Sequence, residues 1–541
     1  MVRRQHNLKF GAMVQSTNHF NFGARPPQRG SYTFTGRFSG IGYADFALGY
    51  PLTTQRPNPS AIRNKFAQNR YQLFAQDDWR VTPRLTLNLG LRYELQILRP
   101  QVYGFAAMFV PNVRNNVVFA ESLPAGALPR LVDAFGLPLA ARVGLPSYLM
   151  DYLGQDRNNV APRIGLAYRI FSRTVFRSGF GIYYNLLNVN WTEQAAFQMP
   201  FATVETFEQG SGTAPTFTMS NPFPGQGNIP GNPDSALLSK PRTPYNIQWS
   251  ATLEHQLAQS IGVRLSYVGQ RNVALLSNVP RNAVTPAPGA VQPRRPFQPF
   301  ANINQINTPV FQSTTHQLQA GLEKRYANGL LLSAQYQFVR AIGTETFQNP
   351  FNWNDSRGNL GGIRKHVFVS SYVWDLPFGK GRRWLSKVSG IQNAAVGGWQ
   401  LAGIIQALSG APFSPGFVTT VQGSVGGRPD VVPGVPLYPA VRNIDLWFNA
   451  PAFARPAEFT FGNAGYNLLW GPGQFNWDAS LVKAFSLRER VDLQLRLEAF
   501  SALNNAQFGN PNATITNPAV VGRITGAGGN RTVQIGAKLQ F

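Results

Sequence analysis

Three scarce features limit what this sequence can encode: cysteine, charge and long apolar runs. Cysteine is absent from all 541 residues, which excludes disulfide bonds, thiol chemistry and thiolate metal sites. Only 13% of the residues are charged. No stretch approaches the roughly 18 uninterrupted apolar residues of a membrane-spanning helix, and even residues 401–408 are interrupted by Gly and Gln. A helical membrane protein is therefore excluded, and a membrane-spanning structure would have to be a β-barrel.

Residues that carry catalysis or bind metals are also scarce. The adjacent Asp77 and Asp78 would face opposite sides of a strand, so they cannot converge on one substrate atom. Residues 378–381 lack the first Gly and the Ser or Thr of a phosphate-binding loop, and no Gly-x-Ser-x-Gly motif occurs. The five histidines lie far apart: His6, His19, His255, His316 and His366. We therefore expect no enzymatic activity, no catalytic residues, no metal site and no cofactor.

Positive charge is in excess, with 49 Lys and Arg against 24 Asp and Glu, a formal net charge of +25. Such an excess raises nucleic acid as a partner. The cations are scattered singly, however, and the pairs at 294–295 and 382–383 lie in Pro-rich or Gly-rich connections. A solvated loop and lumen surface is the better interpretation, so no nucleic-acid partner is predicted. Residues 1–7 contain a basic pair but no apolar export signal, so the chain is either cytoplasmic or a fragment.

Alternating apolar and polar residues predict about fifteen β-strands, and 52 Gly and 41 Pro argue against a helical fold. Residues 85–97 place Leu, Tyr and Ile at odd positions and mostly polar residues at even ones. Residues 247–254 and 491–498 alternate in the same way. Strands with two unlike faces fit a soluble sandwich as well as a membrane barrel.

The lengths of the connections favour a transmembrane barrel. Short turns are predicted at residues 81–84, 171–174, 258–260, 327–329 and 487–490. Long connections are predicted at residues 98–159, 186–242, 270–312, 342–363, 409–476 and 502–530. The two kinds alternate if residues 377–397 form a short-side link, as expected when extracellular loops are long and periplasmic turns are short.

The same pattern predicts which face of each strand meets lipid. We expect residues 85, 87, 89 and 91 to face lipid, and residues 86, 88, 92 and 94 to face the lumen of an antiparallel meander. An arginine such as Arg92 facing hydrocarbon would cost about 2 to 4 kcal/mol at the bilayer midplane. Aromatic residues near strand ends, including Trp374 and Trp399, could form interfacial girdles, although core packing would explain each of them singly.

Several of these segments resemble a known family, the TonB-dependent outer-membrane receptors of the Oar-like type found in some soil bacteria. The similar segments, which cover nearly the whole chain in order, are residues 71–80, 85–94, 159–168, 179–185, 376–381, 397–400, 462–465, 476–478 and the terminal Phe541. They are strands and turns, so the resemblance identifies architecture better than ligand.

The resemblance implies a barrel of about 22 strands that is filled by an N-terminal plug. Residues 1–541 are then expected to be the β-barrel domain of such a receptor, N-terminally truncated and lacking the signal peptide, regulatory-like domain and plug, with about 15 to 16 strands present. The chain alone is not expected to be an active transporter. The sequence leaves open whether the barrel closes, whether the chain is a gene fragment, and its oligomeric state.

The function implied by the resemblance is uptake of a bulky nutrient, such as a carbohydrate or siderophore, through the Gram-negative outer membrane. Expected partners are outer-membrane lipid and lipopolysaccharide, the barrel-assembly machinery, an unknown small-molecule or oligosaccharide ligand, and TonB through the missing N-terminal region only. A passive porin-like or adhesive barrel is the second hypothesis, and a soluble β-rich binding protein or carbohydrate-active enzyme is the third. Trp191, Phe207 and Phe217 would suit ligand stacking, but loop packing is favoured and the ligand-binding residues stay unknown.

The C-terminal residues form one further candidate site. Apolar residues alternate to the last position of the chain, at Val533, Ile535, Ala537, Leu539 and Phe541. By resemblance these residues are the signal that outer-membrane barrels present to the assembly machinery. A last edge strand without a signalling role is the alternative.

Overall fold

Short helices and long strands make up this protein. The computed structural model describes residues 2–3, 5–22, 29–58, 63–99, 107–110, 117–119, 129–144, 156–187, 199–200, 203–229, 236–237, 242–301, 303–488 and 491–541. Helices in these ranges include α1 (Gly42–Leu48), α2 (Pro129–Phe135) and α5 (Gly390–Val396). Within the same ranges, no helix is long and apolar enough to cross a membrane.

One large sheet dominates the fold and contains 17 strands among the described residues, all paired antiparallel except the two-residue β12 (Ala236–Leu237), which pairs parallel with β15 (Asn304–Ala327). Each long strand pairs antiparallel with the next one along the chain, so the predicted meander is confirmed. The long strands are β2 (His6–Phe22), β5 (Arg63–Thr82), β6 (Leu85–Arg99), β9 (Val160–Phe171), β10 (Thr174–Tyr184), β13 (Tyr245–Ala258), β14 (Ile261–Pro280), β15 (Asn304–Ala327), β16 (Leu330–Thr344), β18 (His366–Asp375), β19 (Trp399–Leu408), β24 (Gln474–Arg488), β25 (Val491–Phe500) and β28 (Thr532–Gln540). Short strands β1 (Val2–Arg3), β12 (Ala236–Leu237) and β17 (Arg357–Asn359) complete the sheet.

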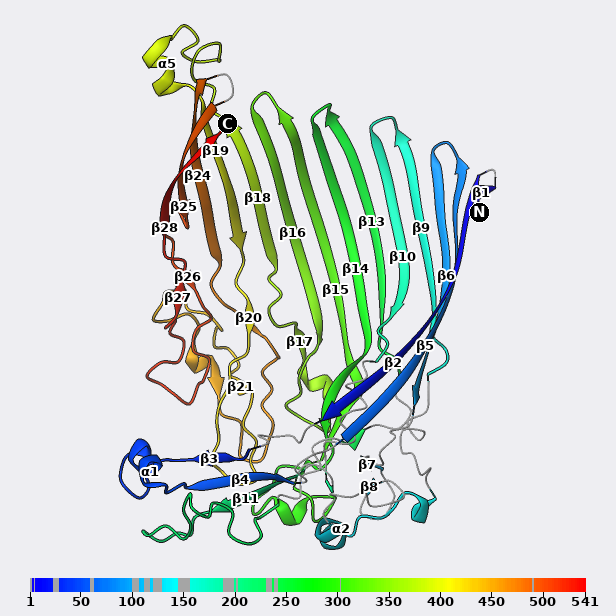
Figure 1. Cartoon of the computed structure of the whole chain (residues 1–541), viewed down its shortest axis with the longest axis vertical. Coiled ribbons are helices and arrows are strands. Elements are labelled where there is room, and N and C mark those ends of the chain that lie inside the picture. The colour runs from blue at the N-terminus through cyan, green and yellow to red at the C-terminus, as the bar shows by residue number, and fades with distance from the viewer. Residues whose placement is uncertain are drawn as a thin grey trace.

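Tight turns gather at one end of the sheet, as Figure 1 shows. All five predicted short turns join adjacent strands: β5 to β6, β9 to β10, β13 to β14, β15 to β16 and β24 to β25. The link from β18 to β19 lies at the same end and carries α5, a helix that the sequence did not predict. In a transmembrane barrel short turns lie on the periplasmic side, so this end corresponds to the predicted periplasmic end.

Long connections lie at the opposite end, and most of their predicted limits hold within a few residues. The predicted loop 270–312 is too long, because β14 and β15 continue to Pro280 and back from Asn304. Their pairing shifts register between Asn272 and Leu275 and twice more beyond it. These bulges interrupt the alternation from which the strand ends were predicted.

Small sheets occur in the described parts of the long connections. β3 (Ser31–Thr33), β4 (Thr53–Asn58) and β11 (Thr203–Glu208) form one of them. The others are pairs: β7 (Ala107–Phe109) with β8 (Val117–Phe119), β20 (Pro412–Phe413) with β23 (Leu469–Trp470), β21 (Asp430–Val431) with β22 (Phe453–Ala454), and β26 (Gln507–Phe508) with β27 (Ala527–Gly528). Figure 1 places β3, β4, β11, β7 and β8 at the end away from the tight turns.

The two faces of the large sheet differ in chemistry. One row of directly paired residues on the apolar face is Leu253, Leu265, Ala320, Tyr336, Phe368 and Ala407. The adjacent row on the other face is Glu254, Arg264, Gly321, Gln335, Val369 and Gln406. Leu265 is 51% exposed although it lies mid-sheet. An exposed apolar face of this extent is what lipid requires.

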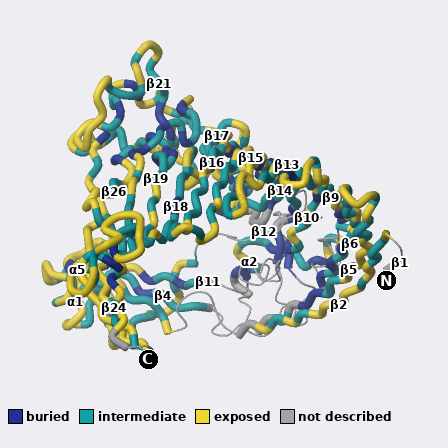
Figure 2. The backbone as a smooth tube through the Cα atoms, turned by 90° about the horizontal axis from the view of Figure 1, so that it is seen from above, coloured by how far each residue is buried: buried dark blue, intermediate teal, exposed yellow. Residues whose placement is uncertain are grey.

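The sheet is curved but open. Seen along the strands, it follows an arc with a gap between its ends (Figure 2). Among the described residues, β28 pairs only with β25, whereas β2 pairs with β5 and with the two-residue β1. The architecture is therefore an antiparallel barrel-type sheet whose first and last strands are not joined.

Candidate functional site

The polar face of β5 and β6 carries a connected group of side chains. Arg92 Nε donates to Glu94 Oε1 at 2.5 Å, and its guanidinium also donates to Gln72. Glu94 and Gln72 are buried, whereas Leu89 and Leu91 on the opposite face are 40% and 54% exposed. The predicted orientation of β6 is therefore confirmed where the structure tests it: Arg92 and Glu94 satisfy each other away from lipid.

The same polar face also holds the start of a long connection. Gln96 Nε2 donates to the Leu187 carbonyl at 2.6 Å, and the Leu187 N–H donates back to Gln96 Oε1 at 2.8 Å. Arg70 donates to the same carbonyl at 2.9 Å. The chain that leaves β10 is thus fixed across the inner side of the sheet, which identifies the polar face as the lumen face.

A charged cavity lies on this face near the periplasmic turns. Its volume is about 370 Å³, and its lining includes Glu254, Arg264, Glu323 and Gln335. Arg177 Nε lies 3.2 Å from Glu254, and Arg264 donates to Gln335 at 3.3 Å. The partly exposed carboxylates and guanidinium groups of this cavity can accept and donate hydrogen bonds to a polar molecule or protein segment in the lumen.

The long connection after β19 folds around an apolar core, against which Ala513, Ile515 and Val521 of the connection after β25 also pack. Phe448 and Leu469 are fully buried, and Phe413 and Phe453 are nearly so. Tyr438 packs at the edge of this core, accepts the Trp470 N–H at 2.7 Å and lies 4.6 Å from the Arg442 guanidinium. Burial raises the pKa of Tyr438, although the Trp470 N–H and the Arg442 charge act in the opposite sense. This body, residues 409–473, is called here the outer body.

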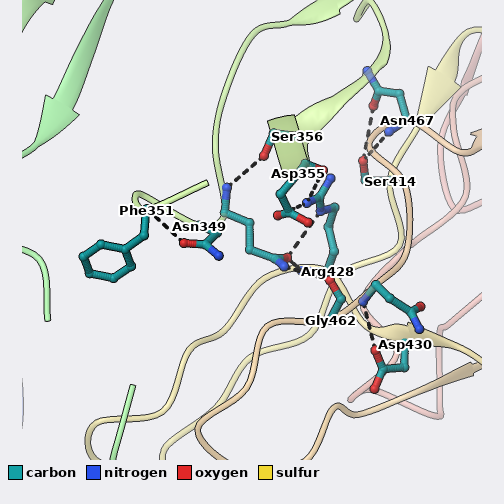
Figure 3. Close-up of polar contacts among 11 residues, drawn as sticks. Asn349, Phe351, Asp355, Ser356, Ser414, Arg428, Asp430, Gly462 and Asn467 are labelled. Atoms are coloured by element: carbon teal, nitrogen blue, oxygen red, sulfur yellow. Dashed lines mark hydrogen bonds and ion pairs between the residues drawn. The ribbon is translucent and has the colours of Figure 1, made fainter. Parts of the chain in front are cut away.

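An arginine latch joins the outer body to the connection after β16, as Figure 3 shows. Arg428 is 6% exposed and donates to Asp355 Oδ2 at 2.5 Å and to the Asp355 carbonyl at 2.9 Å. Its backbone N–H donates to Gln348 Oε1 at 2.7 Å, and Gln348 Nε2 donates to the Gly462 carbonyl at 2.9 Å. Two segments far apart in sequence therefore form one outer surface.

A second polar pair reinforces this junction. Asn467 Nδ2 donates to the Asn359 carbonyl at 2.8 Å, and Asn359 Nδ2 donates back to the Asn467 carbonyl at 2.9 Å. The Asn467 N–H also donates to Ser414 Oγ at 2.8 Å (Figure 3). Nothing in the local sequence around Arg428 or Asn467 indicated these contacts, because their partners are more than fifty residues away.

Aromatic residues named as ligand candidates are packed rather than open. Phe207 is 5% exposed and lies 5.2 Å from the Arg56 guanidinium, which also pairs with Glu205. Phe217 is 8% exposed. Loop packing, the favoured interpretation, therefore holds for both, and Trp191 lies outside the described residues.

Four of the five histidines take part in cross-strand polar contacts. His6 Nδ1 lies 2.7 Å from Asp77 Oδ2, and His255 Nδ1 lies 2.8 Å from Thr174 Oγ1. His316 and His366 contact the hydroxyls of Tyr267 and Tyr336 at 2.7 and 2.8 Å. In the described part of the chain, no group of three or more potential ligands could hold a metal ion.

The predicted assembly signal lies on the last strand. Val533, Ile535 and Leu539 pair with Ala499, Leu497 and Leu493 of β25. All three belong to the apolar face and are 54%, 82% and 54% exposed, and Phe541 beyond β28 is 97% exposed. The geometry fits both an edge strand and a recognition signal, so the role of these residues stays a prediction.

Known proteins resemble this chain at the level of fold. No curated protein matches it significantly. A solved structure of the outer membrane transporter YddB from Escherichia coli has a TM-score of 0.51 and 11% identity, with 100% of this chain and 52% of that chain covered. The receptor for ferric preacinetobactin, BauA from Acinetobacter baumannii, has a TM-score of 0.44 and 11% identity, with 100% and 52% covered. The ferric yersiniabactin uptake receptor FyuA from Yersinia pestis has a TM-score of 0.42 and 8% identity, with 100% and 52% covered.

The chain spans about half the length of these solved structures. The model of the outer membrane beta barrel domain matches residues 1–534, which is nearly the whole chain. The sheet has one apolar and one polar face, tight turns at one end and long connections at the other, which is the architecture of outer-membrane β-barrels. The chain therefore belongs to the outer membrane beta barrel domain family and is a protein of the Gram-negative outer membrane.

Proposed function

We propose that this chain is the membrane-spanning part of a TonB-dependent transporter that takes up a bulky nutrient, such as an oligosaccharide or a ferric siderophore. The observation that carries the proposal is the outer body, which has a buried apolar core and is joined by Arg428 to a second connection. A packed outer surface above a polar lumen face is what selective capture of a large solute requires.

The solved structures of similar fold support the class of function. YddB is described as an outer membrane transporter, and FyuA as an uptake receptor for ferric yersiniabactin. We propose that residues 1–541 act as the barrel domain of such a receptor, together with a plug and a segment that contacts TonB. The charged cavity beside Glu254 and Arg264 faces the lumen and suits contact with a plug.

Uptake measurements test the proposal. Cells that carry the intact gene and cells from which it is deleted would be compared for accumulation of labelled maltodextrins and ferric siderophores, with and without an uncoupler of the proton gradient. We expect the deletion and the uncoupler to abolish accumulation of the same compound. Accumulation that depends on the gene but not on the proton gradient would instead identify a passive barrel.

The latch supplies a matched pair of variants for the same assay. Arg428→Met removes the contact between the two outer connections, whereas Arg455→Met replaces an exposed arginine of the same outer body. We expect Arg428→Met alone to lower uptake, through a higher KM. Equal uptake by both variants would mean that the latch has no part in capture.

A further inference from the structure

The link between β18 and β19 is unlike the other periplasmic turns. Residues 376–398 replace a tight turn with a longer segment that contains α5. The segment carries Lys380, Arg382, Arg383 and Lys387 but no acidic residue. All four cations are exposed, and in the described part of the chain none of them forms an ion pair. We call residues 376–398 the basic link.

Exposed apolar side chains are interspersed with these cations. Trp384, Leu385 and Ile391 are 47%, 53% and 89% exposed. The Arg383 guanidinium lies 5.9 Å from the Trp384 ring. Cations alternating with exposed aromatic and aliphatic groups are typical of a segment that lies in a membrane interface, where charges meet headgroups and apolar groups enter the acyl boundary.

An apolar groove runs between α5 and the lipid face of the sheet. Its volume is about 580 Å³, and its lining includes Ala394, Ala395, Leu481, Leu497 and Ile535. The three strand residues form one cross-strand row on the apolar face. Hence α5 covers part of the surface that meets lipid, and the groove opens toward the bilayer. In Figure 1, α5 stands beside the periplasmic ends of β19 and β24.

A buried lysine fixes the depth of this groove in the membrane. Lys483 lies on the apolar face, directly paired with Trp399 and Leu495, and is 4% exposed. Its ammonium donates to the Gly397 carbonyl and lies 5.5 Å from the Trp399 ring and 4.8 Å from the Phe485 ring. A lysine on a lipid face is tolerated at the interface, not at the midplane. The basic link is therefore at headgroup depth.

We propose that the basic link and the groove beside α5 bind an anionic phospholipid of the periplasmic leaflet. One acyl chain lies in the groove against Leu481 and Leu497. The phosphate of the headgroup is held by the exposed cations, of which Arg382 and Arg383 present planar donors that match its oxygens. Charge complementarity selects this occupant, because every charged side chain of the basic link is positive.

Lipid binding by the purified full chain tests the proposal. The chain, extracted from outer membranes in a mild detergent, would be titrated with phosphatidylglycerol or with phosphatidylethanolamine of the same acyl chains. Native mass spectrometry would count the lipids bound. We expect tighter binding of phosphatidylglycerol. The fourfold variant Lys380→Gln, Arg382→Gln, Arg383→Gln, Lys387→Gln should lose that preference, with affinity falling roughly tenfold or more.

Two further variants keep the test specific. A matched control replaces four exposed cations of the outer connections by Gln, Arg29, Arg157, Arg357 and Arg455, and should bind phosphatidylglycerol as the parent does. Ala395→Trp fills the groove and should weaken binding of both lipids. Heat-modifiable mobility on gels confirms that each variant is folded.

Three results would overturn the proposal. They are equal affinity for the two lipids in the parent chain, unchanged preference in the fourfold basic-link variant, and an equal loss in the control. A lipid-independent dimer that Ala395→Trp disperses would instead show that the groove binds a second copy of the chain, and would overturn it as well.

Discussion

The assignment of faces predicts a large difference between two arginine substitutions. Leu265 and Gln319 lie on neighbouring strands at nearly the same height, since Ser266 and Leu265 pair with Gln319 and Ala320. Leu265 belongs to the apolar face and is 51% exposed, whereas Gln319 belongs to the lumen face. Leu265→Arg should place a guanidinium in hydrocarbon, whereas Gln319→Arg should place one in water beside other polar groups.

The magnitude follows from depth. Leu265 lies four residues from Ile261, where β14 begins, which at roughly 3.3 Å per residue is about 13 Å along a tilted strand. This places it inside the hydrocarbon but short of the midplane. Arginine costs about 2 to 4 kcal/mol at the midplane and about 0 to 1 kcal/mol near the interfaces, so we expect roughly 1 to 2 kcal/mol here, against near zero on a solvated lumen face. Denaturant unfolding from phosphatidylcholine vesicles, followed by tryptophan fluorescence, measures both values. If Gln319→Arg costs as much as Leu265→Arg, the assignment of faces is wrong.

Three further predictions concern the outer surface and the C-terminus. Arg428→Met should leave Asp355 without its cation and cost about 2 to 4 kcal/mol, seen as faster protease cleavage of the outer body on intact cells; unchanged cleavage would contradict a structural latch. Burial raises the pKa of Asp45, but hydrogen bonds from Ser39 and Phe38 outweigh it and hold the pKa below 3.8. The stabilisation by ionised Asp45 is therefore present above pH 3.8 and is lost as the pH falls through the folded-state pKa. Hydrogen exchange near α1 should rise over that acidic range in the parent chain but not in Asp45→Asn. Deleting Phe541 from an otherwise intact receptor should sharply lower its amount in outer-membrane fractions, whereas Gln540→Ser should not; equal amounts would leave only an edge strand.

Local alternation was enough to predict the membrane part of this fold. The turns after β5, β9, β13, β15 and β24 were located because apolar periodicity stops on both sides of each one. The direction of Arg92 followed from the same periodicity and from the cost of a charge in lipid. Both inferences depend on neighbouring residues only, which is why the sequence sufficed.

Features that depend on distant residues were not predicted. The core of the outer body joins Phe413 to Leu469, and the latch joins Arg428 to Asp355, with no local signal for either contact. Helix α5 lies in a Gly-rich segment that reads as a turn. One signal was available for the groove: Lys483 occupies an apolar position in the alternation of β24, which a lipid face tolerates only near headgroups.

The parity of the sheet restricts how its open edges can be satisfied. β2 runs from the periplasmic end outward, and β28 runs from the outer end back. Their directions are opposite because they are the first and the last of the 14 long strands, and strand direction alternates along a meander. The two edges are therefore antiparallel to each other. They could pair directly, or through an even number of inserted strands, but an odd number would force one parallel pair with slanted hydrogen bonds. The two-residue β1 pairs with β2 at this edge. Any set of strands that completes the wall, with the strand that β1 belongs to counted among them, must therefore be even in number.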